Sequence, residues 1–135
     1  MTYYNILCEI NKSICKNSEI RKNTEQFFKI IDTEIKKTLY NSNNNDELIY
    51  NAMKVAALIK LYQPFYDGNH RTALIMFGNL LTEKGLEFDY QTALHDMKNN
   101  NLNIPTIYDQ NDKIGNFSNW YKYINYTIQN EKGLR

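Results

Sequence analysis

The sequence predicts an all-α protein, because helix breakers are scarce and apolar residues recur at helical spacing. Proline occurs only at Pro64 and Pro105 in the 135 residues, and glycine occurs five times. Between these breakers, apolar residues follow one another at intervals of three and four, which is the period of one helix face. We therefore expect a helical bundle that forms a single domain over residues 1–135.

The first two predicted helices each carry one apolar stripe. The first runs from Thr2 to Lys16, and the second begins at a cap, either Ser18 or Thr24, and ends at Tyr40. The stripe of the first helix consists of Tyr3, Ile6, Leu7, Ile10 and Ile14, and that of the second of Phe27, Phe28, Ile31, Ile35 and Leu39.

The third predicted helix, from Glu47 to Tyr62, is apolar on nearly every side from Ala52 onward, which predicts a central, buried helix. The polar stretch 41–46 precedes it and ends in a cap, because Asn44 and Glu47 have the spacing of a capping box.

Three further helices are predicted after this one. The fourth runs from Arg71 to Lys84 and is stopped by Gly85. A fifth is capped by Asp89 and runs to Asn100, and the region around Pro105 is irregular. A last helix from Ser118 to Asn130 packs Trp120, Ile124 and Ile128.

The composition is that of a globular domain. Its 42% hydrophobic and 23% charged residues are ordinary values, and the net charge of +1 gives no reason to expect a nucleic-acid partner. No run reaches the ~18 apolar residues of a membrane span, and Met1 to Glu9 contain no basic region followed by an apolar stretch, so we expect no signal peptide. Cys8 and Cys15 are separated by roughly 10 Å of helix rise, too far to bond each other. We therefore expect reduced thiols and a cytoplasmic protein without a membrane partner, although secretion without a cleavable signal stays open.

The junction between the third and fourth helices, residues 62–74 (YQPFYDGNHRTAL), carries most of the functional information. Pro64 disfavours helix at Gln63, and Gly68 permits a turn with positive φ. The backbone N–H groups of Gly68 to Arg71 then lie at a helix N-terminus, where unpaired donors and the helix dipole favour an anion.

The side chains of the junction suit a magnesium-nucleotide. Arg71 can add a charge-assisted contact to a phosphate, and Asp67 can hold a divalent cation that bridges phosphates. Asn69 can bind phosphate, stabilise the loop, or do both. The simpler alternatives are that Asp67 caps the turn and that Arg71 is a solvated helix residue.

These residues resemble the core motif of the Fic/Doc (Fido) family, H-x-F-x-[D/E]-G-N-[G/K]-R-x-x-R. Phe65, Asp67, Gly68, Asn69 and Arg71 match it. Three positions depart from the motif, namely Gln63 at the histidine, His70 at the Gly or Lys, and Leu74 at the distal Arg.

The continuation Thr72-Ala73-Leu74, with Gly85 closing the next helix, is closer to the death-on-curing (Doc) branch of the family, and the similarity covers residues 52–88. The resemblance implies a Fic/Doc-like helical bundle with the motif loop between two central helices. It also implies ATP or another nucleotide with Mg²⁺ as ligands, and a target protein or an antitoxin-like protein as partner.

Position 63 decides what the resemblance implies for catalysis. The family's histidine takes a proton from a target hydroxyl, whereas the Gln63 carboxamide has no usable basicity near neutral pH. His70 is the candidate substitute base, since imidazole titrates in the right range, although it can equally serve only as a phosphate contact. The only other histidine is His95, on a separate predicted helix.

Two hypotheses follow. The first is a transferase that moves AMP or phosphate from a nucleotide to a protein hydroxyl, with His70 as base. The second, favoured by Gln63 and Leu74, is a catalytically impaired protein that binds a nucleotide, a protein partner or both.

Overall fold

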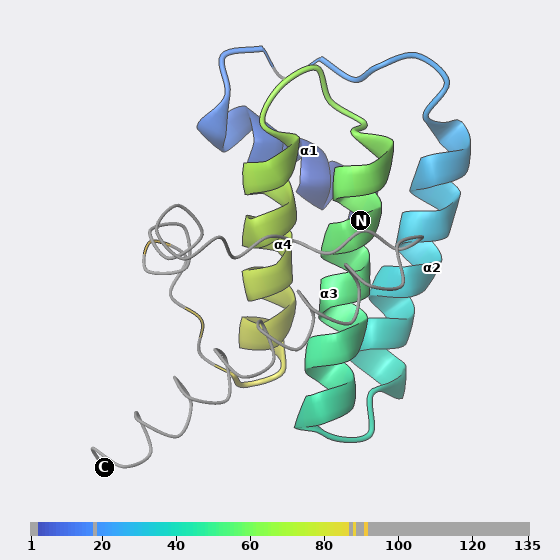
Figure 1. The fold of residues 1–135 in the computed structure, drawn as a ribbon, viewed down its shortest axis with the longest axis vertical. Coiled ribbons are helices and arrows are strands. Elements are labelled where there is room, and N and C mark those ends of the chain that lie inside the picture. Colours follow the sequence, from blue (N-terminus) through green and yellow to red (C-terminus); the bar gives the residue numbers. More distant parts are fainter. Residues whose placement is uncertain (1–2, 18, 87, 89–90, 92–135) are drawn as a thin grey trace.

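The computed structural model describes residues 3–17, 19–86, 88 and 91, and these form four α-helices (Figure 1). The helices are α1 (Tyr3–Ile14), α2 (Glu25–Asn41), α3 (Asn45–Tyr62) and α4 (Asn69–Glu83). α3 packs between α2 and α4, and α1 packs across α4 and α2. Within the described residues there is no β-strand, only an isolated bridge between Ile20 and Phe65, so the all-α prediction is confirmed for this part of the chain.

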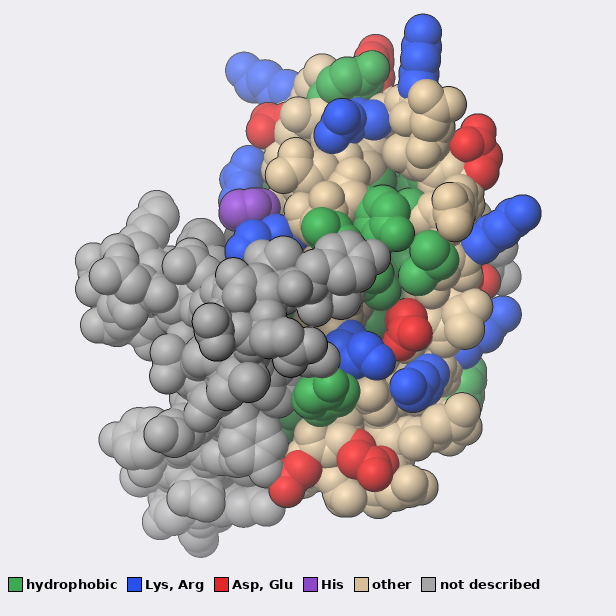
Figure 2. Space-filling model, turned by 45° about the vertical axis from the view of Figure 1, so that its right-hand side comes forward, with side chains coloured by type: hydrophobic (Ala, Val, Ile, Leu, Met, Phe, Trp, Pro, Cys, Tyr) green, Lys and Arg blue, Asp and Glu red, His purple; other side chains and the backbone are tan. Residues whose placement is uncertain are grey.

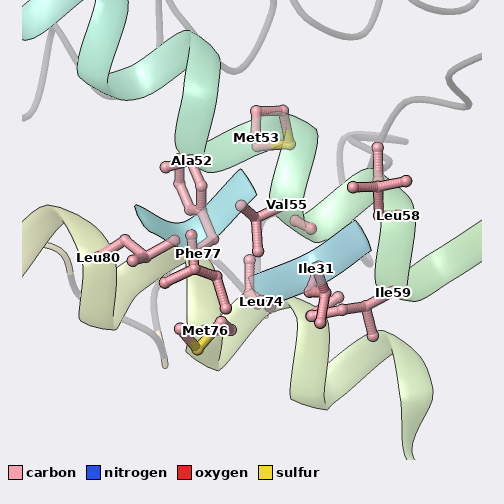
Figure 3. Close-up of a cluster of buried hydrophobic side chains, with 14 of the residues drawn as sticks. Ile31, Ala52, Met53, Val55, Leu58, Ile59, Leu74, Met76, Phe77 and Leu80 are labelled. Carbon is pink, nitrogen blue, oxygen red and sulfur yellow. The ribbon is translucent and has the colours of Figure 1, made fainter. Parts of the chain in front are cut away.

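α3 is the central helix, as its all-round apolar character predicted. Ala56, Ala57 and Leu58 are at most 8% exposed. Leu61, in the last turn of the same helix, is only half-buried. Figure 3 shows how Val55 and Ile59 of α3 meet side chains from both neighbouring helices. Each such aliphatic side chain stabilises the fold by ~1.5–3 kcal/mol on burial, so α3 is the main contributor to the core.

α1 and α2 bury the stripes that their spacing predicted only in part. In α1, Leu7 and Ile10 are buried, the other three members of the stripe are half-buried, and the helix ends at Ile14, two residues before the predicted end. In α2, the buried positions are Phe27, Ile31, Ile35 and Thr38, whereas Phe28 and Leu39 are half-buried. The N-cap is Thr24, although its hydroxyl makes no capping bond and donates to Arg21 O instead (3.2 Å).

The connection between α2 and α3 is closed by its own side chains. Asn44 Oδ1 accepts a hydrogen bond from the Glu47 N–H at 2.9 Å, and Glu47 Oε2 accepts one from the Asn43 N–H at 2.8 Å. The predicted capping pair is therefore confirmed, although the glutamate bonds the residue before the cap. The helix begins at Asn45, two residues before the predicted start.

α4 begins at Asn69 and not at Arg71, so the predicted start was wrong by two residues. The reason is that Gly68 adopts the left-handed conformation (φ 75°) and acts as the N-cap, which lets the helix start directly after it. The helix ends at Glu83, and Gly85 adopts positive φ (90°) just after it, as predicted.

Several predictions fall outside the described residues. They are the Ser18 cap, the helices Asp89–Asn100 and Ser118–Asn130, the region around Pro105, and His95. Cys8 and Cys15 are not bonded to each other, as their spacing predicted. Among the described helices, none combines the length and apolar character that crossing a membrane requires.

Candidate functional site

The motif loop leaves α3 through a left-handed residue. Gln63 has φ 46° and ψ 63°, and its N–H donates to Ile59 O at 2.9 Å, which closes the end of α3. A non-glycine residue in this conformation costs about 1–2 kcal/mol. Pro64 follows immediately and disfavours right-handed helix at Gln63, so the sequence forces the helix to end at this position. The Gln63 side chain is exposed.

Phe65 and Asn69 fix the shape of the loop. Phe65 is 1% exposed and anchors the loop in the core. Asn69 Oδ1 accepts from the Phe65 N–H at 3.0 Å, and Asn69 Nδ2 donates to Phe65 O at 2.8 Å. Of the two roles predicted for Asn69, the structure therefore places the side chain in the loop-stabilising one.

The first turn of α4 presents backbone donors without protein partners. Asp67 Oδ1 accepts from the Gly68 N–H at 2.9 Å, so this amide is taken by the turn-capping role that was the simpler alternative for Asp67. The first N–H bonded within the helix is that of Thr72, which donates to Gly68 O at 2.9 Å. Among the described residues, the N–H groups of Asn69, His70 and Arg71 have no acceptor.

Arg71 lies against the end of α1. Its Nη2 donates to Ile14 O at 3.3 Å and approaches Cys15 Sγ at 3.8 Å. The guanidinium thus satisfies a carbonyl at the C-terminus of α1, where helices have unpaired acceptors. Because the Arg71 side chain is exposed, little free energy is lost when it exchanges this contact for another partner.

The predicted site residues line one open pocket of about 330 Å³. Its walls are formed by Gln63, Tyr66, Asp67, Gly68, Asn69, His70 and Arg71. His70 is exposed in the first turn of α4. The folding of the loop therefore brings together both positions considered for proton transfer, Gln63 and His70, with the N–H groups of Asn69, His70 and Arg71. The volume lies at the small end of the range found for ligand pockets.

Leu74 lies outside this pocket. It is fully buried in the core at the position of the family's distal arginine. An arginine there would place a charge among aliphatic side chains, so the departure from the motif fits the packing of this bundle.

Sequence reasoning missed Asn11 of α1. Its side chain is 0% exposed, and its Nδ2 donates to Asp67 O at 2.8 Å and to Thr72 Oγ1 at 3.2 Å. Its Oδ1 is buried without a hydrogen-bond partner in the described structure. The one sequence signal for Asn11 was that a polar residue lies on the buried face of a helix, four residues after Leu7. Its partners could not be inferred, because they lie 56 and 61 residues away in the sequence.

A second missed element is the segment 19–21, which pairs with the loop. The Arg21 N–H donates to Pro64 O at 2.8 Å, and the Tyr66 N–H donates to Glu19 O at 3.2 Å. The Arg21 side chain also donates to Gln63 O at 3.3 Å. Figure 1 shows the connection between α1 and α2 beside the motif loop at one end of the bundle.

A larger hollow of about 700 Å³ runs along α2, and Ile20 and Phe28 supply its apolar lining. Figure 2 turns this side of the molecule forward and shows hydrophobic side chains between charged ones. Of its two carboxylates, Glu25 and Asp32, the second is already engaged by the Tyr3 N–H at 3.3 Å and by Lys36 Nζ at 3.5 Å. The smaller pocket is the better candidate, since it is bordered by backbone donors that have no acceptor among the described residues.

No three His, Cys, Asp or Glu side chains of the described residues gather around a common point where they could hold a metal ion. A cation in the pocket would therefore depend on Asp67 together with ligand oxygens. The Asp67 side chain is exposed, and only its Oδ1 accepts a hydrogen bond from the described protein, so its second oxygen fits this use.

Comparison of the chain with protein-family models, curated proteins and solved structures finds no match.

Proposed function

We propose that this protein is a Fic/Doc-like helical bundle that binds a nucleotide or another phosphate compound at the motif loop, and that it acts through this binding or through a protein partner. One observation carries the proposal. Within the part of the chain that the structure describes, the N–H groups of Asn69, His70 and Arg71 have no acceptor; they lie at the start of a 15-residue helix and border an open pocket. Such donors, added to the helix dipole, favour an anion.

Side chains around these amides support the same ligand class. His70 and Arg71 are exposed and line the pocket, and either can add a charge-assisted hydrogen bond to a phosphate. For Arg71 this requires leaving Ile14 O, or contacting the ligand with a different guanidinium nitrogen. Asp67 would hold Mg²⁺ that bridges phosphates.

Catalytic impairment is part of the proposal because the site lacks the motif's base. A carboxamide at position 63 cannot take a proton near neutral pH, and general-base catalysis is worth ~10²–10⁴-fold. The alternative is an active transferase that moves AMP or phosphate from ATP to a protein hydroxyl, with His70 as base. It is supported by the position of His70, which borders the same pocket as Gln63.

Labelling with radioactive ATP separates these functions. The native protein, Gln63→His and His70→Ala are incubated with a cell lysate and with ATP labelled at the α- or the γ-phosphate. We expect only Gln63→His to label proteins, because the pocket is kept and the base is restored. Labelling by the native protein that disappears in His70→Ala, with ATP affinity unchanged, would establish the transferase instead.

Binding is tested separately by calorimetric titration of ATP with magnesium and with chelator. We expect tighter binding with magnesium, and we expect Asp67→Asn to remove that difference. Equal affinity under both conditions in the native protein would exclude the metal role of Asp67, and no measurable binding under either would exclude the proposed function.

A further inference from the structure

We propose that Asn11, on α1, is a positioning residue of the anion site and holds the loop in the conformation that exposes the amides of α4. This inference rests on the proposed function, because it assigns a role within the same site. It also extends the site to a helix that lies outside the motif.

The contacts of Asn11 enclose the binding segment on both sides. Asn11 Nδ2 donates to the carbonyl of Asp67, immediately before the segment 68–71, and to the hydroxyl of Thr72, immediately after it; a longer contact of 3.9 Å reaches Cys15 Sγ, a weak acceptor. Asn11 is fully buried, and its amide orientation is fixed, since a carbonyl such as Asp67 O accepts hydrogen bonds only.

The bond to Asp67 O controls the peptide that leads into α4. In a trans peptide the C=O and N–H point in opposite directions, so a carbonyl held toward α1 directs the Gly68 N–H away from α1. Glycine accepts either sign of φ, so the Asp67–Gly68 peptide could rotate if nothing held it. Rotation would turn a carbonyl oxygen toward the side on which the amides attract an anion. The bond from Asn11 to the carbonyl of this peptide opposes the rotation, together with the bond from the peptide's own N–H to Asp67 Oδ1.

The surroundings of Gly68 show that the loop lies directly against α1. A Cβ on Gly68 would collide with Cys15 Sγ and would lie 3.2 Å from Asn11 Nδ2. The loop backbone thus touches α1 directly, which is what allows an asparagine side chain to reach Asp67 O.

Packing alone does not explain an asparagine at this position. Its Oδ1 is buried without a partner in the described structure, which is unfavourable, whereas leucine would fill similar space without an unpaired acceptor. Leucine cannot make the hydrogen bonds to Asp67 O and Thr72 Oγ1. These bonds to the loop therefore explain why the position is polar.

The test compares Asn11→Leu with Asn51→Leu. Asn51 is the matched control, because it is a buried asparagine whose Nδ2 donates to Ser42 Oγ at the other end of α3 (3.1 Å). Two quantities are measured by ¹⁵N-resolved NMR. One is the set of Gly68 and Asn69 amide signals in the protein without ligand, and the other is their shift on titration with inorganic sulfate.

We expect Asn11→Leu to stay folded, to shift or broaden the Gly68 and Asn69 signals without ligand, and to bind sulfate about tenfold more weakly, the scale of one lost hydrogen bond. Asn51→Leu should leave both quantities at native values. If Asn11→Leu does not fold, the nearly isosteric Thr72→Val removes one of the two contacts and should change both quantities in the same direction.

The outcomes separate this inference from the proposed function. If the native protein does not bind sulfate but the loop signals still change in Asn11→Leu, the proposed function fails and Asn11 remains a determinant of the loop conformation. Native loop signals and native sulfate affinity in Asn11→Leu would overturn the positioning role and leave the proposed function standing.

Discussion

The two junctions that flank α3 solve the same problem in opposite ways. Before α3, Asn44 and Glu47 supply side-chain acceptors, and their bonds at 2.9 and 2.8 Å close the N-terminus of the helix. Before α4, the N-cap is Gly68, which has no side chain, and the following amides are left without acceptors in the described structure. One helix start is closed by its own side chains, and the other is open.

The open junction is nevertheless the more elaborately supported of the two. Phe65, Asn69, Asn11 and the segment 19–21 all hold the loop backbone, but none of them takes the amides of His70 and Arg71. The loop backbone is therefore held by several contacts while, within the described residues, these amides have no acceptor, which is the arrangement expected of a binding site.

The largest expected effect concerns α3 itself, since both junctions depend on it. Met53→Asp or Ala57→Lys should prevent folding, because these positions are 1% and 3% exposed and each variant buries an unpaired charge. Thermal unfolding followed by circular dichroism checks this. Thr82→Asp, at an exposed position of α4, is the control and should melt cooperatively. A cooperative transition in the α3 variants would contradict the central position of this helix.

The next effect tests whether the open junction requires glycine. Gly68→Ala should lower the free energy of unfolding by about 2–4 kcal/mol, because it combines positive φ with a collision against Cys15 Sγ. Gly85→Ala is the matched control, since Gly85 also has positive φ but has no neighbouring atom within 4 Å of an added Cβ. It should cost about 1–2 kcal/mol. Equal losses in urea denaturation would show that the contact with α1 is unimportant.

Arg71→Ala tests whether the open junction binds an anion. ATP affinity should fall by about 1.5–3 kcal/mol, the value of a charge-assisted contact, with a smaller change in stability. Arg21→Ala is the control, because Arg21 lies at the same end of the bundle and contacts Gln63 O but does not line the pocket. Unchanged ATP affinity of Arg71→Ala in calorimetry would remove Arg71 from the site.

The smallest effect belongs to the closed junction. Asn44→Ala should cost about 1 kcal/mol of unfolding free energy, the usual value of an N-cap. It should not change sulfate or ATP affinity, because the cap lies at the opposite end of α3 from the pocket. A change in affinity would mean that the two junctions are coupled through α3.

Local chemistry explains which features were predictable. Helical spacing located all four described helices, and Pro64 with Gly68 located the junction, because these signals act within a few residues. The exact start of α4 was missed, since it depends on the conformation of Gly68. The placement of Asn11 against Asp67 and of Arg71 against Ile14 was not predictable, because both contacts join α1 to residues more than fifty positions later.

The pairing of residues 19–21 with the motif loop also bears on the order of folding. α3 and α4 are neighbours in sequence and can pack early, whereas the loop acquires its shape from contacts that close segments of 42 to 61 residues. Such contacts form late and are among the first to open when the native state fluctuates. We therefore expect the loop to take its final shape last, so that a molecule can hold most of its core before the pocket of the motif loop has formed.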